Sequence, residues 1–133
     1  MRRITLSTFM FAFLSFASTA STSITIDAKK NCLAAPSDST MTSGSSAIFQ
    51  LEQGRYVLSL VSNSMNCSSL SSITCPIDVV MVAGGMKNAR WGISVTSTPV
   101  VVDSTTTSFI AYISDNNCYD NVGQATLLIQ KSE

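Results

Sequence analysis

A polar stretch near the C-terminal end, residues 114–123 (SDNNCYDNVG), holds two carboxylates and three carboxamides. Such a stretch suits calcium, which takes about six to eight oxygen ligands from carboxylates, side-chain amides and backbone carbonyls. Asp115 and Asp120 would supply the charge, and Asn121 would add a neutral side-chain oxygen. A backbone carbonyl at Asn117 or Cys118 would provide a further ligand. The residue types therefore predict a cation site, with calcium as the ion.

The same stretch is also compatible with a plain hairpin turn. Asp, Asn and Gly are frequent in turns, because their side chains bond to the local backbone and tolerate left-handed conformations. Gly123 would supply the positive φ that returns the chain to a strand. Residues 114–123 make a long connection for a turn alone, and their spacing is not that of an EF-hand, whose acidic positions alternate and end in a Glu. Both interpretations stay open at this point.

Catalysis is not what the residue types indicate. The chain contains no histidine, which removes the Ser-His-Asp and Cys-His constellations and the His-Glu-x-x-His metalloprotease motif. Asp115 and Asp120 would serve as a glycosidase acid/base pair only if an apolar pocket raised the pKa of one of them, and their neighbours in the sequence are polar. We therefore expect a protein that is not an enzyme.

All four cysteines lie after the N-terminal segment. They are Cys32, Cys67, Cys75 and Cys118. An oxidising compartment favours disulfides over free thiols, but sequence does not choose among the alternative pairings. A zinc site is the competing interpretation, yet no two cysteines have Cys-x-x-Cys spacing and no histidine is present. We expect one or two disulfides.

The N-terminal segment has the order of a secretory signal peptide, with basic residues at 2–3, an apolar stretch at 9–17 and small residues at 18–20. Cleavage is expected after Ala20. The apolar part is shorter than the roughly 20 residues that span a bilayer, so we expect no membrane span. Residues 21–133 are then one secreted or periplasmic domain.

Charge excludes one class of partner. Outside the predicted signal peptide the chain carries six Lys and Arg and eight Asp and Glu, a net charge of −2. Because no basic stripe is present, nucleic acid is not an expected partner.

The elements that would position the polar stretch read as strands. Apolar and β-branched residues alternate with small polar ones and are separated by Ser, Asn, Gly and Pro clusters. We expect strands at residues 23–28, 47–51, 56–61, 77–82, 91–96, 98–102, 107–113 and 124–130, and loops at residues 37–46 and 62–74. In 56–61 one face would carry Tyr56, Leu58 and Leu60. The sequence predicts an all-β fold, an antiparallel β-sandwich that is jelly-roll-like.

Two aromatic residues are candidates for stacking on a sugar ring. Tyr119 lies inside the polar stretch, from which it could face solvent or fold onto the sandwich. Trp91 begins a predicted strand, where a lone Trp is more often part of the core than an exposed platform.

The order of these pieces resembles the PA-IL-like calcium-dependent galactophilic lectins of bacteria. Asp115-x-x-x-x-Asp120-Asn121-x-Gly123, followed by ATLLI at 125–129, is similar to the C-terminal calcium loop and last strand of that family. FQLEQGRYVLSL at 49–60 is similar to its strand, Gly turn and following strand, and IDVVMVAGG at 77–85 to its central apolar strand.

The resemblance implies a β-sandwich with one calcium at its rim, where two hydroxyls of a hexose, typically galactose, complete the coordination. By position, Asp115, Asp120 and Asn121 would be the family's metal and sugar ligands. The residue types and their place in the loop add the carbonyl of Cys118 to the metal ligands, and Asn117 and Tyr119 to the carbohydrate contacts. A carbonyl near Asn66 or Cys67 would come from a second loop.

This sequence departs from the family pattern in ways that bear on the sugar. The gap between Asp115 and Asp120 is shorter than in the best-known members, and the pair Asp120-Asn121 stands where they have Asn-Asn. The family's sugar-contacting histidine loop has no counterpart, since the chain lacks histidine. Galactose specificity is therefore not carried over.

Two functional hypotheses follow. The first is a non-catalytic, calcium-dependent carbohydrate-binding module; the second is a structural or protein-interaction module whose acidic loop closes a hairpin or holds a structural calcium. A homo-oligomer is left open, because multivalency is how weak sugar sites become useful.

Overall fold

The computed structural model describes residues 21–34, 44–68, 70, 72 and 74–132. The predicted signal peptide, residues 1–20, and most of the predicted loop at 37–46 lie outside this part of the chain. Within it, no helix has the length and apolar character that a membrane span requires.

Nine strands and one short 3-10 turn follow one another along the described chain. They are β1 (Ser21–Asp27), β2 (Cys32–Ala34), β3 (Ala47–Leu51), β4 (Gly54–Val61), β5 (Val80–Gly84), η1 (Lys87–Ala89), β6 (Trp91–Val95), β7 (Val100–Ser104), β8 (Thr107–Asp115) and β9 (Gln124–Ser132). The all-β prediction is confirmed. Apolar residues at every second position share one face of a strand, which can then be buried, whereas in a helix they would not share a face.

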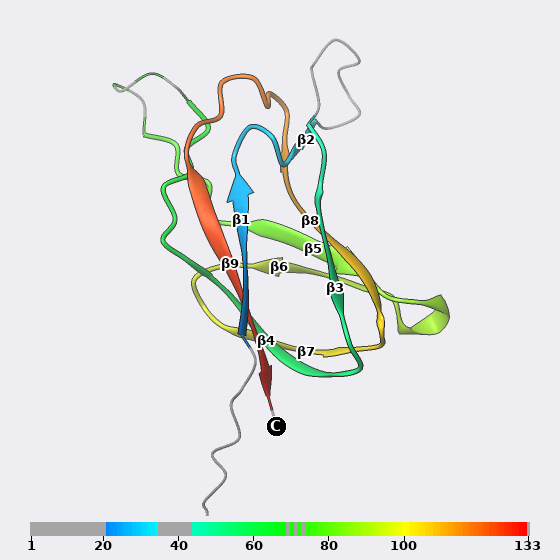
Figure 1. Cartoon of the computed structure of the whole chain (residues 1–133). Helices are drawn as coiled ribbons and strands as arrows, with labels where there is room; N and C mark the ends of the chain where they lie inside the picture. Colours follow the sequence, from blue (N-terminus) through cyan, green and yellow to red (C-terminus); the bar gives the residue numbers. More distant parts are fainter. Residues whose placement is uncertain (1–20, 35–43, 69, 71, 73, 133) are drawn as a thin grey trace, which may run out of the picture.

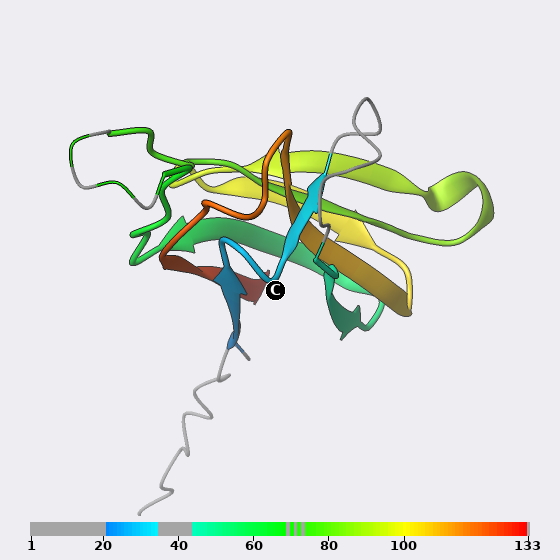
Figure 2. The ribbon, with the colours of Figure 1, turned by 90° about the horizontal axis from the view of Figure 1, so that it is seen from above.

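The strands form two sheets, which lie as two layers in the view from above (Figure 2). One sheet has the order β1-β9-β4-β7, and the other has the order β2-β8-β5-β6 with β3 also paired to β8. All pairings are antiparallel except that of β2 with β8. Most connections cross from one sheet to the other (Figure 1), and this alternation is that of a jelly roll. The predicted β-sandwich is therefore confirmed.

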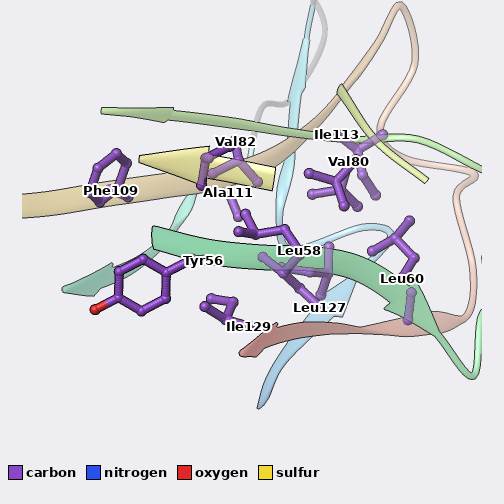
Figure 3. Close-up of a cluster of buried hydrophobic side chains, with 14 of the residues drawn as sticks. Tyr56, Leu58, Leu60, Val80, Val82, Phe109, Ala111, Ile113, Leu127 and Ile129 are labelled. Atoms are coloured by element: carbon purple, nitrogen blue, oxygen red, sulfur yellow. The ribbon is translucent and has the colours of Figure 1, made fainter. Parts of the chain in front are cut away.

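The core fills the space between the two sheets (Figure 3). Tyr56, Leu58 and Leu60 of β4 are buried as the alternation predicts, and Leu127 and Ile129 of β9 are buried beside them. The opposite sheet contributes Val80, Val82, Val95, Phe109, Ala111 and Ile113. Burial of each large apolar side chain stabilises the fold by about 1.5–3 kcal/mol. These buried faces fix the register of both sheets, since a slip of one residue would turn them to solvent.

Trp91 packs against one end of this core. Its ring centroid lies 4.6 Å from that of Phe109, and its indole N–H donates to the carbonyl of Asp103 over 3.0 Å. The side chain is partly buried, so the core-packing interpretation holds for one side of the ring.

Two predicted strands begin too early. The predicted strand at 77–82 is β5, which begins at Val80, because the carbonyl of Ile77 accepts from the Asn63 side chain and its amide donates to Met65. The predicted strand at 98–102 is β7, which begins at Val100, because the amide of Thr98 donates to the hydroxyl of Thr96 in a turn. A local side-chain bond thus replaces the sheet ladder at Thr98, whereas Ile77 is bonded to the chain at residues 63–65.

Strand β2 was not among the predicted strands. It is short and pairs in parallel with residues 113–115 of β8, which extends β8 beyond its predicted end. Three residues carry too little alternation to indicate a strand, so this pairing depends on a distant part of the chain.

Two neighbouring leucines of β9 provide a test of the two faces. Leu127 is fully buried between the sheets, whereas Leu128 is half-buried on the outer face. We expect Leu127→Ala to lower the free energy of unfolding by about 2–5 kcal/mol, because it leaves a cavity in the core. Leu128→Ala should cost less than half as much. Denaturant unfolding of both variants measures the difference, and equal losses would contradict the assigned register.

Candidate functional site

The polar stretch connects β8 to β9 at one end of the sandwich. Asp115 is the last residue of β8, and Gln124 is the first residue of β9. Residues 115–123, which we call the acidic loop after Asp115 and Asp120, are held from two sides. On one side Asn66 and Val122 exchange backbone hydrogen bonds of 2.9 Å, and on the other the amide of Ala28 donates to the carbonyl of Gly123 over 3.0 Å. The structure therefore brings the predicted second loop, at 62–74, alongside the acidic loop.

Disulfides tie both loops to the sandwich. Cys32 pairs with Cys118, and Cys67 pairs with Cys75. The first bond joins β2 to the middle of the acidic loop, and the second closes the neighbouring loop. The two bonds indicate an oxidising, extracytoplasmic location. The sulfur of Cys118 is engaged in the disulfide, so this residue can offer a cation its carbonyl oxygen.

A tight turn between β1 and β2 is hydrogen-bonded to the C-terminal end of the acidic loop. One carboxylate oxygen of Asp27 accepts from the amides of Lys29 and Lys30 at 3.0 and 2.9 Å, and the other accepts from the Gln124 side chain at 3.2 Å. The Lys30 amide above all holds the pKa of the Asp27 carboxyl below its usual range, and the lowering persists although partial burial opposes it. The ionised carboxylate therefore stabilises this turn.

Asn121 points into the protein. Its side chain is 1% exposed, and its amide nitrogen donates to the carbonyl of Ala28 over 3.1 Å and lies 3.5 Å from the sulfur of Cys32. Its side-chain oxygen is buried and accepts no hydrogen bond. The interior position means that a sugar in solvent does not reach this side chain directly.

Asp120, the residue before Asn121, also has a buried oxygen without a partner. One of its carboxylate oxygens is buried and has no hydrogen-bond partner, although the residue as a whole is partly exposed. Buried acceptors without partners are uncommon in native proteins, because desolvation then goes uncompensated. Two consecutive residues, Asp120 and Asn121, thus each have a buried side-chain oxygen that accepts no hydrogen bond from a described residue.

Asp115 and Asn117 serve the local backbone. One oxygen of Asp115 accepts from the amides of Asn116 and Asn117 at 2.6 and 3.4 Å, and the side-chain oxygen of Asn117 accepts from the amide of Tyr119 at 3.2 Å. These bonds are the Asx turns of the plain-turn interpretation. The second carboxylate oxygen of Asp115 makes no hydrogen bond to a described residue.

Tyr119 is the most exposed apolar group of the loop, at 70% exposure. The ammonium of Lys29 lies 4.3 Å from its ring centroid, within the range of a cation–π contact. The ring therefore faces solvent, and one of its faces is covered by a flexible lysine.

A hollow of about 500 Å³ opens beside the acidic loop. Asp78, Asp115 and Asn116 provide its polar lining, while Pro76, Val79 and the Cys67–Cys75 disulfide provide much of its apolar lining. Its size is within the range of small-ligand pockets. Sequence reasoning did not find Asp78, because that residue falls inside the stretch predicted as a strand.

Gly123 has the positive φ that the sequence predicts, at +86°. A Cβ at this position would lie 2.1 Å from the carbonyl oxygen of Ser64, which any side chain would displace. The glycine therefore allows both the turn and the close approach of the two loops.

The residues present fit a cation in part. Two unpartnered buried oxygens, a free carboxylate oxygen on Asp115 and nearby carbonyls are suitable ligands for a hard cation. Among the described residues, however, no three His, Cys, Asp or Glu side chains gather into a metal-binding group. An ion here would depend on amide and carbonyl oxygens, and on water, for most of its coordination.

No protein-family model matches the chain, and neither a curated protein nor a solved structure shows a significant match to it. The likeness to galactophilic lectins therefore stays a hypothesis that depends on the quoted residues.

The two disulfides should differ in their effect on stability. Cys32 and Cys118 are 86 residues apart, whereas Cys67 and Cys75 are 8 apart. Because a longer closed loop restricts the unfolded chain more, replacing Cys32 and Cys118 by Ala should cost about 4–5 kcal/mol, against about 2–3 for Cys67 and Cys75. Denaturant unfolding of the two double variants measures both losses. A larger loss for the Cys67–Cys75 pair would contradict this account.

The Asp27 turn predicts a loss of stability in acid. A carboxyl whose pKa is lowered in the folded state stabilises the fold above its unfolded value of about 3.9, and this contribution disappears as the pH falls through the lower folded value. Thermal melts from pH 6 to pH 2 should therefore be less pH-dependent in Asp27→Asn than in the parent. Asp103→Asn, at the opposite edge of the same sheet, removes a second carboxyl whose pKa is lowered; because its ion pair with Arg55 is exposed to solvent, this variant should flatten the pH profile less than Asp27→Asn does. Parallel pH profiles for the parent and Asp27→Asn would refute the role of Asp27.

Proposed function

We propose that this chain is an exported, non-catalytic module that binds carbohydrate with the help of a calcium ion in the acidic loop. The observation that carries the proposal is the pair of buried, unpartnered oxygens on Asp120 and Asn121. A cation would be a partner for both oxygens, since neither accepts a hydrogen bond from a described residue.

The ion would be held by a few named groups. Asp120 would give charge and Asn121 a neutral oxygen, while Asp115 would give its free carboxylate oxygen. The carbonyl of Cys118 would add a backbone ligand fixed in place by the disulfide to Cys32. Bound calcium supplies a positive centre to which hydroxyl oxygens can add. The Asn121 amide, anchored on Ala28, would keep its oxygen oriented in the absence of the ion.

The sugar would lie on the solvent side of the loop. Tyr119 offers an exposed ring for the apolar face of a hexose, and Asp115 and Asn117 lie at the start of the loop. The adjoining hollow, with Asp78 and Asn116 on its lining, would receive neighbouring parts of a glycan. Asn121 is buried and would act on the sugar only through the ion.

We propose no catalytic step for this loop. A general acid of a glycosidase needs a carboxyl whose pKa is raised. Asp115 instead accepts hydrogen bonds from two backbone amides, and the residues around Asp120 in the sequence are mostly polar.

Exposed apolar side chains favour a second candidate, a protein-interaction module. At the end of the sandwich that carries the acidic loop, Leu70, Val79, Tyr119 and Val122 are each at least 40% exposed. Apolar groups gathered in this way mark interaction sites. In this alternative the ion, if bound, has a structural role.

Calcium binding is tested by thermal unfolding of the mature protein with calcium or with chelator. Calcium at about 100 times its dissociation constant should raise the free energy of unfolding by about 2.7 kcal/mol. Asp120→Ala should abolish this increase, because it removes a charged ligand. Asp103→Ala removes the same charge from β7, at the edge of the four-stranded sheet, and should keep the increase.

A glycan array with and without chelator then separates the two candidates. Calcium-dependent glycan signals that Asp120→Ala removes support the carbohydrate proposal. A calcium-induced increase in melting temperature without any glycan signal supports the second candidate. The absence of any calcium effect at millimolar concentration would overturn the cation site.

A further inference from the structure

A second hollow, of about 550 Å³, lies at the opposite end of the five-stranded sheet. The acidic loop follows β8 near the start of β5, whereas this hollow adjoins the hairpin that follows the end of β5. That hairpin, residues 85–90, projects from the sandwich (Figures 1 and 2). The two hollows are therefore separate and share no lining residue.

The floor of this second hollow is apolar. Ala83 pairs with Gly92 on one side and with Ile110 on the other, so the three residues form a row across β6, β5 and β8. A Cβ on Gly92 would lie 3.7 Å from the Cβ of Ala83, which is ordinary contact on the outer face. The glycine leaves this part of the floor open, and the surface suits the apolar face of a small ring.

The rim of the hollow carries a positive charge without a partner. Arg90 lines it and is exposed, and within the described part of the chain no carboxylate lies within ion-pair distance of its guanidinium. Lys87, in the same hairpin, also has no ion pair there. By contrast, Arg55 and Lys131 are paired with acidic residues. This hairpin therefore holds uncompensated cationic charge beside an apolar floor.

The backbone below Arg90 is held firmly. The following residue, Trp91, packs against Phe109 and donates its indole N–H to the Asp103 carbonyl. Gly85 enters the hairpin with φ +104°, and a Cβ there would lie 2.3 Å from the carbonyl oxygen of Ala89. The hairpin is thus tightly folded at its base, which lowers the ordering cost when its arginine binds a ligand.

We propose that this hollow binds the carboxylate-bearing sugar ring of an acidic glycan. The guanidinium of Arg90 would pair with the carboxylate through two parallel N–H···O bonds, a geometry that Arg provides and Lys does not. The apolar row would receive one face of the ring, and the hydroxyl of Ser108 on the lining would bond to a ring hydroxyl. No part of this site uses calcium or the acidic loop.

The chain has a built-in reporter for this site. Trp91 is the single tryptophan of the sequence and lines the hollow. Titration of the mature protein with glucuronate, in the presence of chelator, should give a saturable change in tryptophan fluorescence. Glucose should bind with an affinity at least about tenfold lower, because it lacks the carboxylate that makes the charge-assisted bonds. The chelator keeps this result independent of the calcium proposal.

Three variants locate the binding. Arg90→Gln should weaken glucuronate binding about tenfold or more, through loss of the charge-assisted bonds. Gly92→Val should abolish it by filling the floor, whereas Ser94→Val, two residues along the same face of β6 and outside the hollow, should leave it unchanged. Melting temperatures close to the parent's show that each variant is folded.

Several results would overturn the proposal. Unaltered glucuronate binding in Gly92→Val or in Arg90→Gln excludes this hollow as the site. Equal responses to glucose and glucuronate exclude recognition of the carboxylate. Acetate or sulfate that reproduces the glucuronate response at equal concentration shows a simple anion site and excludes recognition of the sugar ring. If Gly92→Val does not fold, Arg90→Gln decides the result alone.

Discussion

Burial of one face of each sheet against the other is the constraint on which the rest of the structure depends. Leu58 and Leu127 from one layer, and Val82 and Phe109 from the other, are completely removed from solvent. With the interior filled by apolar side chains, the polar chemistry of the chain falls to the ends and outer faces of the sandwich. The connections of a jelly roll gather at those ends, which is why the acidic loop and the 62–79 connection meet there.

The end of the sandwich that carries the acidic loop is held rigidly, yet some of its buried polar atoms have no hydrogen-bond partner. Disulfides and backbone bonds hold the loop on both sides, yet Asp120 and Asn121 keep buried oxygens without donors. A buried side-chain oxygen such as that of Asn121 normally has at least one hydrogen-bond partner. The disulfides and backbone bonds thus keep these two oxygens desolvated without a partner, and a bound cation or ordered water would offset this desolvation free energy. Under the proposed function, ion binding and folding of this end would be thermodynamically linked.

The two ends of the five-stranded sheet differ in chemistry. Beside the acidic loop, Asp78 and Asp115 line a hollow, whereas Arg90 lines the hollow at the other end. Because β5 and β8 are antiparallel, the residue that ends one strand lies beside the start of the other, and each hollow draws lining residues from both strands. Under the two proposals, an extended glycan would contact the domain at more than one point, which raises avidity without a stronger individual site.

The sequence by itself determined the strands and the faces that they bury, because alternation with period two is a local property. Residues 56–61 show this: Tyr56, Leu58 and Leu60 are buried as predicted. The sequence also indicated an oxygen-rich loop at 115–123 and its positive-φ glycine. Only the tertiary structure decided the disulfide pairing, the parallel β2 strand and the interior position of Asn121. Those features depend on residues far apart in the chain, such as Ala28 and Asn121, whose meeting no local pattern encodes.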